Sequence, residues 1–183
     1  MKKIILILII ILVGYFVFFY NKKEAPETSN TPETSAAILT DDEVKNATYS
    51  VDEQPVAFVN GRSVVEVPNS SAIITTQYFG NTATGDLDGD TTPDTAFLIT
   101  QNGAGTGTFY FVVVARNTGT GAVGTNAVFL GDRIAPQSTT IQNGKVIVSY
   151  AEHGSSQAMT DTPNVMVSKT LTVKNGVLIE ESN

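Results

Sequence analysis

Four aspartates stand at closely spaced positions near the middle of the chain. Residues 86–94 read DLDGDTTPD, with carboxylates at the first, third, fifth and ninth places: Asp86, Asp88, Asp90 and Asp94. Carboxylates held this close repel one another unless a cation lies between them. Ca²⁺ accepts irregular shells of oxygen ligands, whereas Mg²⁺ requires an octahedron and keeps several waters. The spacing therefore predicts a calcium loop with the four aspartates as side-chain ligands and the backbone carbonyl of Thr92 as a further ligand.

The stretch GDLDGDTTPD resembles the D-x-D-G-D-G-x-x-D loops of FG-GAP and dockerin-type calcium-binding proteins. The resemblance implies the same four carboxylate ligands, but it covers only residues 85–94 and implies neither a propeller nor a dockerin fold. Thr91 stands where those loops carry glycine, and a β-branched residue is strained at positive φ. Phe97 occupies the place of the last acidic ligand of an EF-hand. We expect a looser or weaker site than in those families.

A turn that binds no metal is the alternative, because Asp-Gly pairs are common in turns. Catalysis has little support. The single histidine, His153, stands near Glu152 and Ser155 in the sequence, but proximity in sequence does not make a catalytic site. A Ser-His-acid site depends on geometry and an oxyanion hole, and no G-x-S-x-G motif is present. We expect a non-enzymatic protein. An envelope hydrolase or transferase using the carboxylates or His153 remains the alternative.

The composition excludes several classes of site and partner. The 183 residues contain no cysteine, which excludes disulfides, thiolate metal sites and cysteine nucleophiles. The formal net charge is −7 and the pI is near 4.6. Nucleic-acid binding depends on clustered basic residues, so we expect no nucleic-acid partner.

The N-terminal region predicts a membrane anchor. Residues 4–20 read IILILIIILVGYFVFFY, an apolar helix of roughly 25 Å, which is the short end of what spans a bilayer. Lysines flank both ends, and the N-terminal amine and Glu24 favour a cytoplasmic N-terminus. A cleaved signal peptide needs small residues after a shorter apolar region, and bulky aromatics stand there instead. We expect residues 1–23 to be an uncleaved single-pass anchor in the cell membrane.

A flexible linker and an extracytoplasmic domain are expected to follow. Residues 24–39 are rich in Pro, Thr, Ser and Glu up to Ala37, a composition that cannot form a core. Residues 40–183 form the predicted domain. Thr40 and Glu43 match a capping box, which predicts a short helix that ends near Asn46.

The rest of the chain reads as β-strands. Three Asn-Gly pairs suit type I′ turns and predict three hairpins: 55–59 with 62–67, 138–142 with 145–151, and 168–174 with 177–180. Other apolar runs predict strands at 72–79, 95–100, 108–116 and 127–130. The run at 108–116 is apolar on both faces, so it should be central in its sheet. About nine strands with little helix indicate an all-β antiparallel sheet or sandwich.

A wider resemblance runs from Thr76 to Val148 through QYFGN, ATGDLDGD, GTFYFVV, GTNAVFLGDRIAP and NGKVIV. This stretch is similar to uncharacterised bacterial envelope proteins that carry such a domain behind a signal or anchor. The resemblance implies a location in the cell envelope but no chemistry. The expected function is a tethered binding or interaction module for a protein or a cell-wall polymer. A structural subunit of a membrane complex, joined through the apolar helix, is a further alternative.

Overall fold

The computed structural model describes residues 37–103 and 105–182. The predicted anchor and most of the predicted linker lie outside the described residues. Within the described part, no helix has the length and apolarity needed to cross a membrane. The described residues belong to one compact unit, residues 35–183, and compact units with their own core are the ones that fold independently.

The described chain contains one short helix and twelve strands. Their bounds are α2 (Asp41–Lys45), β1 (Thr48–Val51), β2 (Gln54–Ala57), β3 (Arg62–Glu66), β4 (Ile73–Gly85), β5 (Asp94–Asn102), β6 (Phe109–Asn117), β7 (Ala122–Gly124), β8 (Val128–Asp132), β9 (Ala135–Gln142), β10 (Lys145–Glu152), β11 (Val165–Lys174) and β12 (Val177–Glu180).

The strands form three antiparallel sheets, which confirms the predicted all-β antiparallel class. The largest sheet has the order β3-β4-β5-β6-β7, with β8 also paired to β6. A second sheet has the order β12-β11-β10-β9, and β1 pairs with β2 in the third. The strands that were not predicted, β1 and β7, span only four and three residues.

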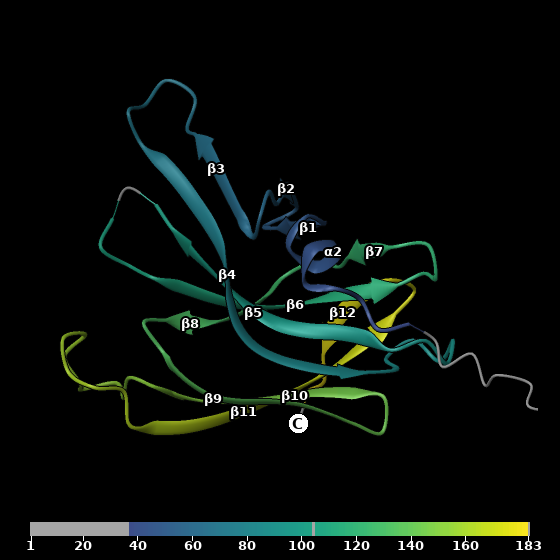
Figure 1. The fold of residues 1–183 in the computed structure, drawn as a ribbon. Helices are drawn as coiled ribbons and strands as arrows, with labels where there is room; N and C mark the ends of the chain where they lie inside the picture. Colours follow the sequence, from purple (N-terminus) through teal and green to yellow (C-terminus); the bar gives the residue numbers. More distant parts are fainter. Residues whose placement is uncertain (1–36, 104, 183) are drawn as a thin grey trace, which may run out of the picture. The chain divides into compact units, whose positions relative to one another are not determined.

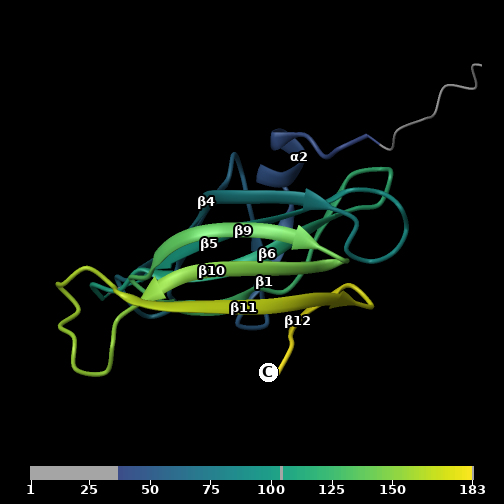
Figure 2. The same ribbon diagram turned by 90° about the horizontal axis from the view of Figure 1, so that it is seen from below.

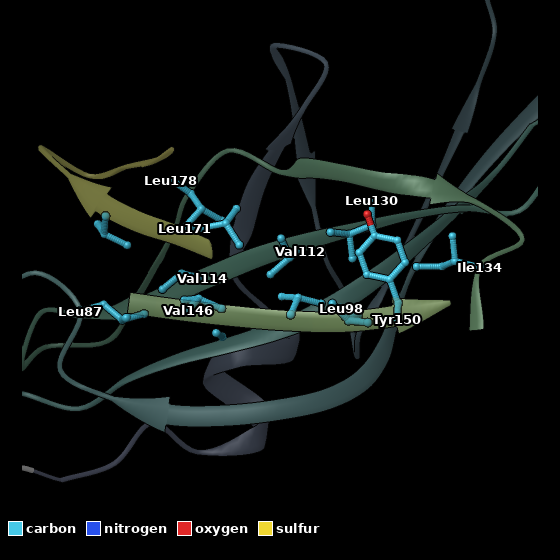
Figure 3. Close-up of a cluster of buried hydrophobic side chains, with 13 residues drawn as sticks. Leu87, Leu98, Val112, Val114, Leu130, Ile134, Val146, Tyr150, Leu171 and Leu178 are labelled. Carbon is cyan, nitrogen blue, oxygen red and sulfur yellow. The ribbon is translucent and has the colours of Figure 1, made fainter. Parts of the chain in front are cut away.

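Two apolar cores lie on opposite faces of the largest sheet. Figures 1 and 2 show β9, β10 and β11 along one side of β5 and β6, with α2 on the other side. The first core joins β5 and β6 to the β9–β12 sheet, and Figure 3 shows Leu98, Val112 and Val114 among the side chains of Val146 and Leu171. The second core joins the other face of β5 and β6 to α2, β1 and β2. The run at 108–116, which contains most of β6, is therefore central, as its two apolar faces predicted.

Two of the three predicted hairpins are confirmed. Asn143-Gly144 joins β9 to β10 and Asn175-Gly176 joins β11 to β12, and all four residues have positive φ. The first predicted hairpin is wrong. Asn60-Gly61 does form a turn, but β2 pairs with β1 and β3 pairs with β4, so only a single bridge joins Val59 to Arg62.

The reason is a second tight turn just before the Asn-Gly pair. Asp52 and Glu53 have φ of 49° and 62° and fold β2 back on β1. Val56 then packs into the second core with β1, and burying that apolar face outweighs the local preference of the Asn-Gly turn. The strand after the turn is left to pair with β4.

The short helix is confirmed with its capping box. The Glu43 N–H donates to Thr40 Oγ1 (3.3 Å), and the Thr40 N–H donates to Glu43 Oε2 (2.8 Å). Just before it, Leu39 is buried in the second core, and the Ala37 carbonyl accepts a hydrogen bond from Asn117 Nδ2 (2.6 Å). The packed part of the chain therefore already includes Leu39.

Candidate metal site

The aspartate-rich segment is the loop between β4 and β5. Gly85 at the end of β4 pairs with Asp94 at the start of β5, so the pairing of the two strands brings the ends of the loop together. Leu87 is 5% exposed and belongs to the first core, where Figure 3 draws it beside Val146. Its burial fixes the loop to the sheet and leaves the neighbouring aspartates outside the apolar core.

Asp94 is the structural centre of the loop. Its side chain is fully buried, at 0% exposure. Oδ2 accepts the Leu87 N–H (3.0 Å) and Oδ1 accepts the Asn117 N–H (2.8 Å), so one carboxylate ties the loop to β6. Burial raises the pKa of Asp94, against the effect of these two bonds, and the charges of Asp88 and Asp90 raise it further. A nearby cation would favour the ionised form of this carboxylate.

Asp86 organises the turn itself. Its Oδ1 accepts the Gly89 N–H (2.8 Å), and its Oδ2 accepts the Thr91 N–H (3.0 Å). Amides of the loop thus point at a carboxylate near the loop's N-terminal end. These bonds hold the loop in a closed turn.

Three of the four aspartates meet at one point. One carboxylate oxygen from each of Asp86, Asp88 and Asp94 lies within 4.8 Å of the other two. Asp90 is outside this group, and its Oδ1 accepts the Thr92 N–H (2.7 Å). Hydrogen bonds from Thr92 lower the pKa of Asp90. Of the five residues predicted as ligands, the structure thus brings three together and pairs the other two with each other.

Thr91 adopts a left-handed backbone conformation, at the position where the loops that the sequence resembles carry glycine. Its φ is 70°, and Gly89 two residues earlier has φ of 84°. Left-handed backbone is costly for a β-branched residue. Thr91 therefore introduces backbone strain into the loop.

Nothing in the sequence points to Arg116, yet among the described residues it is the basic side chain that forms an ion pair with the cluster. Its Nη1 lies 3.4 Å from Asp88 Oδ2, and the two side chains are 25% and 22% exposed. The arginine also lies over the β11–β12 turn, where a Cβ added to Gly176 would be 3.2 Å from Nη2. No spacing rule links residues 28 positions apart. Only the β5–β6 pairing, with Thr95 opposite Ala115, brings Arg116 to the loop.

The chemistry of the donors suits a hard divalent cation. All three clustered groups are carboxylates, and oxygen-only sites favour Ca²⁺ or Mg²⁺ over zinc or copper. Three carboxylates and one guanidinium leave a local charge of −3 + 1 = −2. Asp86, Asp88 and Asp94 would hold the ion, and water or the Thr92 carbonyl would complete the irregular shell that Ca²⁺ accepts.

His153 lies elsewhere, at the end of β10. Its Nε2 is 3.0 Å from the Asp161 carbonyl oxygen, and its Nδ1 is buried without a hydrogen-bond partner among the described residues. Within the same part of the chain, no hydrogen bond joins His153 to a serine hydroxyl or a carboxylate. The ring thus takes part in the β10–β11 loop through the backbone.

Comparison with known proteins adds no relative to these observations. No protein-family model, no curated protein and no solved structure matches the chain.

Proposed function

We propose that residues 35–183 are a non-enzymatic, extracytoplasmic binding module, tethered by the apolar N-terminal segment, whose β4–β5 loop holds a structural Ca²⁺. The observation that carries the metal assignment is the meeting of the Asp86, Asp88 and Asp94 oxygens within 4.8 Å. The tether and its orientation rest on the apolar run at residues 4–20 and its flanking charges. The partner we propose is a protein or a cell-wall polymer.

A bound ion would act through the contacts of the carboxylates. Asp94 connects the loop to the amides of Leu87 and Asn117, and Asp86 closes the turn. Neutralising these charges would remove the repulsion that otherwise opposes the closed loop. Outside the cell, where calcium is millimolar, an affinity of roughly 10⁻⁴ to 10⁻³ M is sufficient to fill such a site.

The same contacts favour a structural role over a catalytic one. Asp94 has the raised pKa expected of an acid-base group. However, its carboxylate is fully buried and both of its oxygens accept backbone N–H groups. A group in that position has no access to a substrate and is suited to fixing the loop.

The test is thermal unfolding of residues 35–183 in about 2 mM calcium and in excess chelator. Binding to the folded state alone stabilises by RT ln(1 + [L]/Kd), which at these affinities is about 0.6 to 1.8 kcal/mol. For a domain of this size the melting temperature should rise by about 2 to 7 °C.

Matched variants separate the site from a general charge effect. Asp88→Asn removes a clustered carboxylate that accepts no backbone N–H in the loop, so the calcium shift should disappear while the domain stays folded. Asp161→Asn removes an exposed acid outside the cluster and should keep the shift. Equal melts with and without calcium in the unaltered domain would refute the metal assignment.

A further inference from the structure

The outer edge of β3 is an unusual surface for a solvent-facing strand. Among the described strands, β3 pairs only with β4 and forms the end of the largest sheet. Val64 and Val65 are each 50% exposed, as is Ile73 on β4. None of these belongs to either core, and the β3–β4 hairpin projects away from the rest of the domain in Figure 1. An apolar edge of this kind is open to the addition of another strand.

The bonds at the two ends of β3 show which backbone groups face outward. Gly61 and Val67 bond on the β4 side, to Tyr78 and Ala72. Arg62 instead exchanges both of its bonds with Val59, at 2.9 and 3.2 Å, on the opposite side. The β3–β4 register has no shift, and backbone groups alternate along a strand. Two further residues of β3 therefore direct their N–H and C=O groups outward: Val64 and Glu66.

We propose that β3 pairs with β3 of a second copy of this chain, antiparallel, with Val65 on the two-fold axis. In this register Val64 of one copy exchanges N–H···O bonds with Glu66 of the other. Every outward-facing group of these two residues then has a partner. An isologous contact of this kind needs only one surface, because the same patch serves both copies.

The side chains complement one another most directly on the face that carries Val65. On one face Val65 lies opposite the second Val65, and Ile74, the β4 partner of Val65, extends the apolar row in each copy. On the other face Val64 lies opposite Glu66 of the second copy, and Arg62 lies diagonal to the same Glu66, within reach of a long side chain. Two residues beyond Glu66 is Pro68, which has no N–H to leave unpaired. This self-complementarity favours a second copy over an unrelated strand.

Disulfide trapping tests the proposed register in the full chain. The chain has no cysteine, so Val65→Cys introduces the only thiol, at a directly opposed pair close enough to bridge. Val177→Cys is the control, because Val177 is 47% exposed on another edge strand, β12. In membranes under mild oxidation, the Val65→Cys chain should form the covalent dimer at least about tenfold faster, since pairing raises the effective thiol concentration. Equal rates for the two variants would overturn the proposal.

Sedimentation equilibrium of residues 35–183 provides the second test. A strand pairing this short belongs with interfaces that bury less than about 1,200 Å² and bind weakly. The protein concentration series should therefore reach about 1 mM. We expect a monomer-dimer equilibrium that Val65→Lys weakens at least about tenfold by opposing two charges, with an unchanged melting temperature as evidence of folding. A monomer throughout the series would overturn self-pairing. A dimer whose dissociation constant is unchanged by Val65→Lys would also overturn it.

Discussion

Replacing Asp94 tests whether this buried carboxylate fastens the metal loop to the sheet. Asp94 accepts the N–H groups of Leu87 and Asn117, and both residues are 5% exposed. Asp94→Ala leaves both donors buried without a partner, at about 1 to 3 kcal/mol each. Removing the carboxylate also removes its own desolvation cost, so we expect a loss of about 2 to 4 kcal/mol in the free energy of unfolding.

Asp94→Asn is the matched variant for this measurement. The amide keeps one oxygen acceptor and presents an NH₂ group to the other donor, so one bond is lost. We expect about half the loss seen with alanine. The assay is urea unfolding of residues 35–183 in excess chelator, with equal m-values as the check that the unfolded state is unchanged. A loss below about 1 kcal/mol for Asp94→Ala, or equal losses for both variants, would refute the assigned role.

The pH dependence provides an independent check on the same residue. Burial raises the pKa of Asp94 in the folded state, so the folded protein holds this proton more tightly than the unfolded chain. Its contribution to stability is therefore fully present below the ordinary carboxyl pKa of about 3.9 and is lost as pH rises through the folded-state pKa. In chelator, the stability difference between the unaltered domain and Asp94→Asn should shrink from about pH 4 to pH 7. A difference that grows over this range would contradict the direction of the shift.

Three further predictions, two of them paired with a comparison variant, probe the loop and the sheet. Thr91→Gly relieves left-handed backbone at φ 70° and, after the entropy of glycine in the unfolded chain, should stabilise the domain by up to about 1 kcal/mol. Gly89→Ala at φ 84° should destabilise the domain, although no atom lies within 4 Å of the added Cβ. Both effects are measured by chemical unfolding. A less stable Thr91→Gly domain together with a more stable Gly89→Ala domain would contradict the assigned backbone strain. Gly124→Ala places a Cβ against the Thr48 carbonyl oxygen and the Tyr49 ring and should cost at least about 3 kcal/mol or prevent folding. Gly103→Ala is the control, because its added Cβ meets nothing within 4 Å; it should change the free energy of unfolding by no more than about 0.5 kcal/mol in the same assay. Similar losses for Gly124→Ala and Gly103→Ala would contradict the packing of β1 on β7. Arg116→Gln frees Asp88 and should enlarge the calcium-induced rise in melting temperature, whereas an unchanged rise would show that Arg116 does not compete with the ion.

The sequence was most informative where local patterns and burial agree. Asn143-Gly144 and Asn175-Gly176 each join strands with complementary apolar faces, and both hairpins form as expected. At Asn60-Gly61 the local turn signal was correct but the pairing was decided by the second core, which holds β1 and β2 together. Pairing between distant strands is a tertiary effect, and a single hairpin motif carries no information about it.

The candidate site was predictable in composition but not in geometry. The spacing of Asp86, Asp88 and Asp94 placed them in one loop, and their oxygens do meet. The sequence did not reveal that Asp90 would bond to the amide of Thr92, because an aspartate that caps its own turn and one that faces an ion look alike in a motif. Arg116 reaches the loop through β-pairing alone, and no local pattern could have indicated it.

The central claim is that a cation sits among Asp86, Asp88 and Asp94. A calcium titration of ¹⁵N-labelled residues 35–183, followed by two-dimensional NMR, tests it most directly because it locates even weak binding. We expect saturable shifts, with a Kd of roughly 10⁻⁴ to 10⁻³ M, concentrated on the amides that bond to the cluster: Leu87, Gly89, Thr91 and Asn117. Asp88→Asn should remove those shifts. Absent shifts at about 10 mM calcium, or shifts spread over acidic residues across the domain, would contradict the claim and leave the segment as an aspartate-rich turn.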